Sequence, residues 1–386
     1  MDFDLSDDQR QIKDSVDRFL ADAYADLKKK VSAQKEPMGY AKANWAKYAE
    51  LGLTAIPFAE DHGGLGAGLI ETMLVMDAIG RNSAIEPYFS TIVLGGGALR
   101  HGASAAQQAA LIPDVIAGTR TLALAHTERQ SRHDLADVNV RARADGSGGY
   151  ILDGEKVVVL GGDTANTIIV SARISGNRRE RGGIGLFLVG GTAAGVTRNG
   201  YPTQDGFRAA DITFKDVKVG AQDVLSGKAQ DGLAILERVV DEGIAALAAE
   251  AVGAMAALHD LTVDYLKTRK QFGVAIGSFQ VLQHKSVDMF TALEQARSMS
   301  FFATMMAGEA DATERRRSIA AAKVQISKSA KFVGETAIQL HGGIGMTMEY
   351  KAGHYFKRLT MIDQAFGNAD HHLRALAGMG GLISAA

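Results

Sequence analysis

The hydrophobic period of this sequence changes twice, and this change constrains the fold more than any other feature. Up to about residue 119 apolar residues recur at helical spacing, and Ser6 and Gln9 have the S-x-x-Q spacing of a helix capping box. From Thr121 to Val219 short runs rich in β-branched residues lie between Gly, Asn and Asp turns, which is typical of strands. Helical spacing returns after Asp231. Because 386 residues also exceed what one hydrophobic core usually supports, we predict a multidomain α+β protein.

These periods predict three domains: an N-terminal all-α domain at 1–119, a middle antiparallel β-barrel at 120–226 and a C-terminal four-helix bundle at 227–386. Helices of the first domain are expected after Ser6, around 45–51, and at 69–79 and 92–99. Strands are expected at 122–124, 138–140, 151–160, 168–171, 184–189 and 211–219, with a solvent-exposed hairpin at 175–183. Bundle helices are expected at about 231–267, 278–308, 315–341 and 364–378. A closed or nearly closed barrel is favoured because closure removes exposed strand edges.

The composition excludes several classes of function. Lys plus Arg number 42 and Asp plus Glu 44, so the net charge of −2 offers no basic field for nucleic acid or an anionic membrane. The absence of cysteine removes disulfides, zinc thiolates and cysteine nucleophiles, and it fits a reducing compartment. The sequence opens without a signal-peptide pattern, and no run of about 20 uninterrupted apolar residues follows. We therefore expect a cytoplasmic protein with no nucleic-acid partner and no membrane span.

Other catalytic signatures are also missing from the sequence. It contains no G-x-S-x-G elbow, no P-loop and no complete G-x-G-x-x-G. The adjacent His371 and His372 would diverge by about 100° on a helix, so they are not expected to chelate one ion. We expect no metal site.

The segment from Arg269 to Gln280 carries the most specific motif. It resembles the R-x-x-F-G-x-x-I-x-x-F-Q segment of the acyl-CoA dehydrogenase family, in which the Arg contacts the FAD pyrophosphate of a neighbouring subunit. A guanidinium fork suits a diphosphate geometrically. The resemblance implies these FAD contacts: Arg269, Gln271, Phe272, Ile276, Phe279 and Gln280.

A glycine-rich turn about seventy residues later resembles a second motif of the family. The sequence from Gln339 to Gly345 is similar to the Q-x-x-G-G-x-G turn that approaches the adenosine end of FAD, and glycines let main chain come close to a ligand. Taken alone the same pattern would be a helix C-cap. The resemblance implies these FAD contacts: Gln339, Leu340, Gly342 and Gly343.

Two stretches of the β-domain match the family less closely. The first, Leu124 to Asp134, resembles a T-E-P-x-A-G-S-D loop, from which a flavin contact by Thr127 carries over, while His133 stands where the family has Ser. The second, Lys156 to Arg173, resembles K-x-W-I-T-N-x-x-x-A, but Val158 and Leu160 replace the flavin-stacking Trp and the Thr. This implies that FAD is held less tightly, or differently, at this end.

The resemblance covers essentially the whole chain and implies a function. It implies FAD-dependent α,β-desaturation of an acyl-CoA, with electron-transfer flavoprotein as partner, in a homotetramer or an α₂β₂ heterotetramer with a large subunit. Within the family the chain looks most like the small subunit of pimeloyl-CoA dehydrogenase and like related two-gene enzymes that act on sterol side chains. The supporting stretches are Pro202 to Gly206, Thr262 to Gly273 and Leu340 to Asp363.

The catalytic base of the family has no obvious counterpart. Gly367 stands at the usual Glu position, between Phe366 and Ala369, which are implied flavin contacts, and the alternative Glu position falls on Gly243. The main-chain N–H of Gly367 could still polarise the thioester oxygen.

Two nearby carboxylates are candidate bases: Glu242 and Glu250. Glu242, taken singly, is expected to be an exposed helix carboxylate. Glu250 lies among small apolar residues, where burial would raise its pKa, although a structural ion pair explains it equally well. The chain is therefore either an independent dehydrogenase or a catalytically silent subunit that completes an FAD site.

Overall fold

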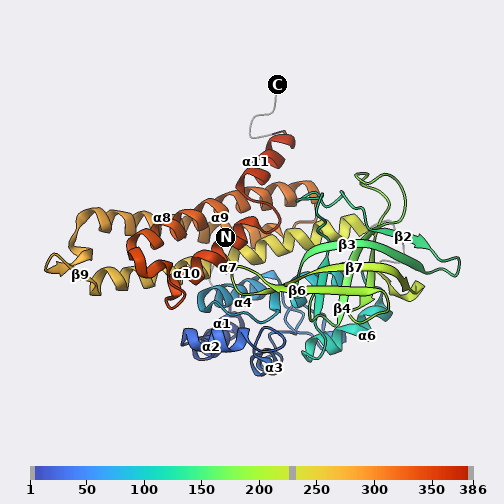
Figure 1. The fold of residues 1–386 in the computed structure, drawn as a ribbon, viewed down its shortest axis with the longest axis horizontal. Coiled ribbons are helices and arrows are strands. Elements are labelled where there is room, and N and C mark those ends of the chain that lie inside the picture. The colour runs from blue at the N-terminus through green and yellow to red at the C-terminus, as the bar shows by residue number, and fades with distance from the viewer. Residues whose placement is uncertain (1–4, 226–231, 381–386) are drawn as a thin grey trace. The chain divides into compact units, whose positions relative to one another are not determined.

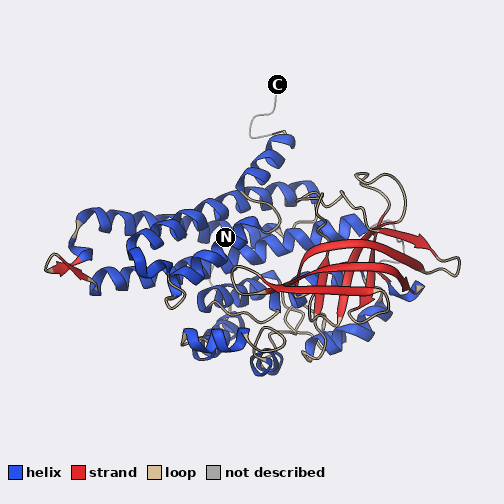
Figure 2. Cartoon of the chain, viewed as in Figure 1, coloured by secondary structure: helices blue, strands red, loops and turns tan. Residues whose placement is uncertain are grey.

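The computed structural model describes residues 5–225 and 232–380, and the chain divides into two compact units (Figures 1 and 2). The first, called here the helical unit, comprises residues 1–32, 69–85 and 244–386. The second, called the sheet unit, comprises residues 33–68 and 86–243.

The helical unit is built mainly from long helices that follow one another along the C-terminal half of the chain (Figure 1). Its helices are α1 (Asp7–Ala23), the first residues of α2 (Leu27–Gln34), α4 (Leu69–Asn82), most of α7 (Gly232–Thr268), α8 (Gln280–Met306), α9 (Ala312–His341), α10 (Lys351–Gln364) and α11 (Ala369–Gly378). A small hairpin, β9 (Lys270–Gln271) and β10 (Val274–Ala275), lies between α7 and α8 and is followed by the 3₁₀ turn η4 (Ile276–Ser278). A second 3₁₀ segment, η5 (Gly342–Met346), follows α9 directly.

Local sequence signals explain how this unit begins and how closely its helices approach. The predicted capping box is confirmed, because the Ser6 hydroxyl accepts from Gln9 N–H at 3.2 Å and the Gln9 side chain accepts from Ser6 N–H at 3.0 Å. Where α4 meets α7, a Cβ on Gly80 would lie 1.9 Å from the Glu250 carbonyl oxygen. A Cβ on Gly253 would lie 2.0 Å from the Asp77 carbonyl oxygen, so two glycines permit this crossing.

Helix α7 is long and apolar enough to cross a membrane by length and composition, but 78% of its most apolar window is buried inside the protein. This burial is what a core helix of a bundle requires, because its apolar residues pack against neighbouring helices.

The sheet unit combines short helices with one eight-stranded sheet. The helices are α3 (Lys42–Glu50), the 3₁₀ turn η1 (Glu60–His62), the π-helical segment η2 (Phe89–Gly95), α5 (Gly96–Gly102), α6 (Ala105–Ile116), the 3₁₀ turn η3 (Ala221–Asp223) and the start of α7. The strands are β1 (Leu122–Ala125), β2 (Arg141–Ala144), β3 (Tyr150–Leu160), β4 (Thr167–Arg173), β5 (Ile184–Gly190), β6 (Val196–Pro202), β7 (Arg208–Val219) and β8 (Val224–Leu225). Their hydrogen-bonded order is β6-β7-β3-β2-β4-β5-β8, and β1 pairs with β4. A contiguous apolar core lies within this sheet and includes Leu152, Ile168, Phe187 and Phe214.

The predicted helix, sheet, helix order is confirmed, with several corrections of detail. Strand pairing is not uniformly antiparallel, because β1 and β2 both pair parallel to β4. Residues 138–140 form no strand, since the N–H groups of Asn139 and Val140 donate to the Glu128 carboxylate instead. Strand β6 was not predicted because its side chains are mostly polar and exposed. Helix α10 was also not predicted, and the helix expected at 364–378 begins only at Ala369.

Candidate active site

The segment from Arg269 to Gln280 folds into the β9–β10 hairpin and the start of α8. Phe272 and Gly273 form its two-residue turn with φ of 54° and 82°, the left-handed pair that a tight hairpin turn of this type requires. The Phe272 side chain is 91% exposed, and Arg269 is also exposed. A left-handed phenylalanine costs about 1–3 kcal/mol, and such strain concentrates at functional sites. The hairpin therefore presents a guanidinium and an aromatic ring outward.

The remaining predicted residues of this segment lie close to the hairpin. Gln271 is exposed within β9, Ile276 begins η4, Phe279 is the N-cap of α8 and Gln280 is its first residue. The rings of Phe272 and Phe279 pack edge to face with centroids 6.1 Å apart. The two aromatic residues of the motif thus form one small apolar surface.

The glycine turn at the end of α9 leaves its main chain open to a ligand. Gly342 has φ of 62°, and a Cβ added to Gly342 or Gly343 would meet no described atom within 4 Å. Gln339 is exposed on the last turn of the helix, whereas Leu340 is buried. The turn fits the close main-chain approach that an adenine dinucleotide requires.

The hairpin and the glycine turn lie at the same end of the helical unit. The ring of Tyr265, on the last turns of α7, stacks on the ring of His341 with centroids 4.7 Å apart. Arg269 follows Tyr265 by four residues, and Gly342 follows His341 directly. The two elements expected to bind FAD are therefore joined through one ring contact.

The turn between α10 and α11 contains the position of the expected base. Phe366 and Gly367 are both left-handed, with φ of 57° and 105°. A Cβ on Gly367 would lie 2.4 Å from Cδ2 of His371, so that imidazole fills the space where a side chain would begin. The Gly367 N–H donates at 3.3 Å to the Gln364 carbonyl, and it must leave this long bond before it can serve a thioester oxygen.

The same turn is held by buried side chains that sequence reasoning missed. Lys323, on α9, is 1% exposed and donates to the carbonyls of Ile362 and, at 3.2 Å, Asp363. The His372 ring lies 3.0 Å from the Phe366 carbonyl, to which it donates through Nε2. Both contacts satisfy carbonyls at the end of α10 and in the turn. Ala369, the last predicted residue of this loop, is the first residue of α11.

Glu250 is buried but engaged in a bidentate ion pair. Its carboxylate is 2.5 Å from Nε and 2.7 Å from Nη2 of Arg358, on α10, and its side chain is 2% exposed. A fork-to-fork pair of this kind occupies both carboxylate oxygens. Of the alternatives open for Glu250, the geometry favours the structural ion pair.

The expectation that Glu242 is exposed was wrong. Its side chain is 3% exposed, and its carboxylate lies 2.8 Å from Arg100, 2.7 Å from His101 and 3.3 Å from Arg238. Burial raises the pKa of Glu242, but hydrogen bonding to His101 and the charges of Arg100, His101 and Arg238 outweigh it and bring the pKa to about 2. A carboxylate with so low a pKa is a weak proton acceptor near neutral pH.

In the sheet unit, the loop after β1 is organised by a buried ion pair. The Glu128 carboxylate lies 2.7 Å from Lys156, which is fully buried, and it also accepts from the N–H groups of Asn139 and Val140. The Glu of the motif is therefore structural in this chain, because four donors, Gln130 among them, surround it. A lysine in the middle of a strand was the only sequence signal of this pair.

The expected flavin contacts of the sheet unit lie in the loop after β1, close to Glu128. The Thr127 hydroxyl bonds the neighbouring His126 ring at 3.1 Å, and His133 is half-buried in the same loop. Val158, at the position of the stacking ring, is 47% exposed with φ of 53° at a β-bulge. Val158 therefore offers FAD an exposed aliphatic side chain where the family's stacking ring would stand.

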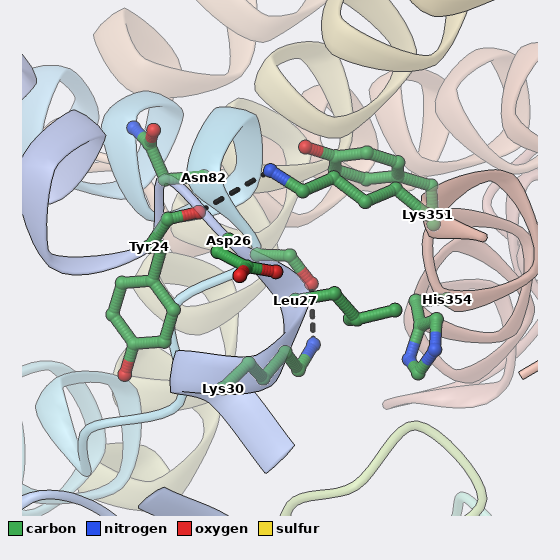
Figure 3. Close-up of a pocket in the computed structure, with 9 residues that line it drawn as sticks. Tyr24, Asp26, Leu27, Lys30, Asn82, Lys351 and His354 are labelled. Carbon is green, nitrogen blue, oxygen red and sulfur yellow. Dashed lines mark hydrogen bonds between the residues drawn. The ribbon is translucent and has the colours of Figure 1, made fainter. Parts of the chain in front are cut away.

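A small pocket in the helical unit was not foreseen from the sequence (Figure 3). Its lining includes Lys30 on α2, Lys351 and His354 on α10, and Asp26 just before α2. Lys351 donates to the carbonyls of Tyr24 and Ala25, and burial, Lys30 and Lys357 lower the pKa of His354. These contacts join α10 to the end of α1. In the part of the chain that the structure describes, no group of three His, Cys, Asp or Glu could hold a metal.

Three family descriptions match nearly the whole chain. "Acyl-CoA dehydrogenase, N-terminal domain" matches residues 6–119, "middle domain" 123–217 and "C-terminal domain" 230–379.

Individual relatives and solved structures agree with these matches. The mitochondrial 2-methylacyl-CoA dehydrogenase of Solanum tuberosum is 30% identical, over 95% of this chain and 89% of its own length. A variant of the Tcur3481–Tcur3483 steroid ACAD has a TM-score of 0.86 at 27% identity, covering 96% of this chain and 97% of that one. The ChsE4–ChsE5 complex of Mycobacterium tuberculosis has a TM-score of 0.86 at 23% identity, covering 98% of both chains.

Proposed function

Because this chain belongs to the acyl-CoA dehydrogenase family of FAD-binding flavoproteins, we propose that it serves in the α,β-desaturation of an acyl-CoA thioester. More narrowly, the chain is proposed to be one subunit of an α₂β₂ complex. In that complex this chain contributes flavin-binding elements, and the partner chain contributes the carboxylate base. Two similar structures support this subunit role: the steroid ACAD is named as a pair of proteins, Tcur3481–Tcur3483, and ChsE4–ChsE5 is described as a complex.

The observation that carries the narrower proposal is the engagement of every candidate base. Glu250 is bound on both oxygens by Arg358, and Glu242 is surrounded by Arg100, His101 and Arg238. At Gly367 the His371 ring fills the space in which a carboxylate side chain would start. A general base must be within hydrogen-bonding distance of the proton that it takes, with a pKa suited to the task.

The flavin-binding elements support the cofactor half of the proposal. Bound FAD would supply the acceptor for the β-hydride, and this chain's residues would bind it. Arg269 would pair with the pyrophosphate, and the open main chain at Gly342 and Gly343 would lie against the adenosine end. Electron-transfer flavoprotein is the proposed electron acceptor. The lack of cysteine suits a cytoplasmic location.

An independent dehydrogenase is the second candidate, and purification separates the two. The chain is purified alone and together with the large-subunit chain, and each preparation is tested for flavin absorbance and for anaerobic bleaching by acyl-CoA. Our proposal expects bleaching only from the mixed assembly. A yellow protein that acyl-CoA bleaches without any partner would contradict the subunit role.

Two substitutions then locate the base if the chain alone is active. Glu250→Gln and Glu242→Gln are tested separately, and Glu335→Gln, at an exposed carboxylate on α9, is the matched control. Loss of bleaching in one variant, with folding intact, would identify that residue as the base. Full activity in both would exclude both.

A further inference from the structure

Three aromatic rings pack together in the helical unit, next to the Arg269 hairpin and the Gly342–Gly343 turn. Tyr265 lies on α7, His341 is the last residue of α9, and Tyr350 is the N-cap of α10. Ring centroids are 4.7 Å apart for Tyr265 and His341, 5.1 Å for His341 and Tyr350, and 6.4 Å for Tyr265 and Tyr350. All three pairs are within the range at which aromatic rings attract one another. We call these residues the ring cluster.

His341 is the centre of the ring cluster and is held in a fixed orientation. The residue is 3% exposed, and its Nδ1 donates to the Ala337 carbonyl at 2.8 Å, one helical turn earlier. This bond sets the tautomer and the ring plane. The Tyr265 ring then lies at 33° to the imidazole, close to an offset stack.

The ring cluster is directly coupled to the hairpin. The Arg269 N–H donates to the Tyr265 carbonyl at 2.8 Å, and the Arg269 carbonyl accepts from the Ile276 N–H at 2.8 Å. The main chain at Arg269 is therefore bonded on one side to the residue that stacks on His341. A displacement of Tyr265 would move the base of the hairpin.

The ring cluster is coupled in the same way to the glycine turn. His341 is bonded covalently to Gly342, whose N–H donates to carbonyls at the end of α9. Gly342 has no side chain with which to pack, and a Cβ placed there would meet no described atom within 4 Å. The orientation of the turn thus depends on the residue that precedes it.

We propose that His341, through the ring cluster, is a positioning residue that sets the Arg269 hairpin and the Gly342–Gly343 turn in register for one dinucleotide. The inference rests on the proposed function, because it assumes that these two elements bind FAD. The proposed role requires no contact between His341, which is 3% exposed, and the cofactor. His341 acts by keeping two separate binding elements at a fixed distance, which lowers the ordering cost of binding.

The test compares two replacements of His341 in the flavin-loaded assembly. His341→Phe keeps a flat ring for both tyrosines, and His341→Ala removes it. FAD dissociation constants are measured by flavin fluorescence, and thermal unfolding of each apoprotein is recorded alongside. We expect about tenfold weaker FAD binding for His341→Ala and about twofold or less for His341→Phe.

A matched control separates positioning from general stability. His259, on α7, packs against the Phe290 ring with centroids 5.8 Å apart and bonds the Ser286 carbonyl at 3.2 Å, contacts that join α7 to α8 and not to the glycine turn. His259→Ala removes a ring contact and a ring-to-carbonyl hydrogen bond of the same kinds as those of His341, and it should leave FAD affinity within about twofold. Equal loss of FAD affinity in both alanine variants would reduce the ring cluster to a packing role and overturn the inference.

Arg269→Gln provides the last comparison. In that background His341→Ala should weaken FAD binding less than it does in the wild type, because no guanidinium remains to be positioned. If the wild-type assembly holds no FAD, the proposed function fails. If it holds FAD and His341→Ala leaves the affinity unchanged, only the positioning role fails.

Discussion

Restoring a carboxylate at residue 367 should destabilise the chain, because the structure has no room for one. A Cβ at Gly367 would lie 2.4 Å from Cδ2, 2.9 Å from Cγ and 3.2 Å from Cβ of His371. The φ of 105° is itself unfavourable for any L side chain and costs about 1–3 kcal/mol. Displacing a packed ring adds about 1–3 kcal/mol. We expect Gly367→Glu to lower the free energy of unfolding by about 2–6 kcal/mol.

The two contributions can be separated with three further variants. Gly367→Ala carries the same Cβ without a carboxylate, so it should show most of the same loss. His371→Ala combined with Gly367→Glu should recover the steric part and leave about 1–3 kcal/mol from the backbone. Gly343→Ala is the control glycine, because its Cβ would meet no described atom within 4 Å.

Urea unfolding of the four variants and the wild type, monitored by circular dichroism, measures these differences. A Gly367→Glu protein within about 0.5 kcal/mol of wild type would refute the reasoning. The same result would mean that the His371 ring moves aside at little cost in free energy. Residue 367 would then be a position that tolerates a carboxylate side chain.

Three other predictions concern buried charges. Glu250→Gln should cost about 3–5 kcal/mol in urea unfolding because the buried Arg358 loses the negative charge of the Glu250 carboxylate, while the double variant Glu250→Leu/Arg358→Met should recover most of it. The folded pKa of Glu242 is depressed from 4.5 to about 2, so its stabilisation is present above pH 4.5 and is lost as the pH falls toward 2; Glu242→Gln should flatten the stability profile in that window. Burial lowers the pKa of Lys323 from 10.5 to about 7, so the unfolded chain binds the extra proton between these values. Stability should then rise by up to about 1.4 kcal/mol per pH unit over pH 7–10, and Lys323→Met should abolish that rise.

Local sequence signals predicted most of the secondary structure because they act over a few residues. The Ser6 capping box and the apolar run of β5 are of this kind, and both formed as expected. The segment 138–140 also contains β-branched residues but forms no strand, because Glu128 supplies the acceptors for the N–H groups of Asn139 and Val140. Hydrophobic periodicity is a local pattern, so it does not predict a hydrogen-bond acceptor that lies ten or more residues away.

The motif from Arg269 to Gln280 folds into a local element, whereas the surroundings of the candidate bases are set by distant residues. The hairpin turn at Phe272 and Gly273 is specified by its own two residues, since glycine readily takes the left-handed conformation. The contact between Tyr265 and His341 joins positions far apart in the sequence, so no local sequence pattern predicts it.

The surroundings of the two candidate bases could not be predicted from residue spacing along a helix. Spacing along α7 says which residues share a face, but it does not say what that face meets. Glu250 meets Arg358, more than one hundred residues later, and Glu242 meets Arg100 and His101, more than one hundred residues earlier. A carboxylate in an apolar helix needs such cations because burying it alone would cost several kcal/mol. Burial of a carboxylate among alanines is therefore evidence for a distant arginine at least as much as for a catalytic base, and only the fold distinguishes the two.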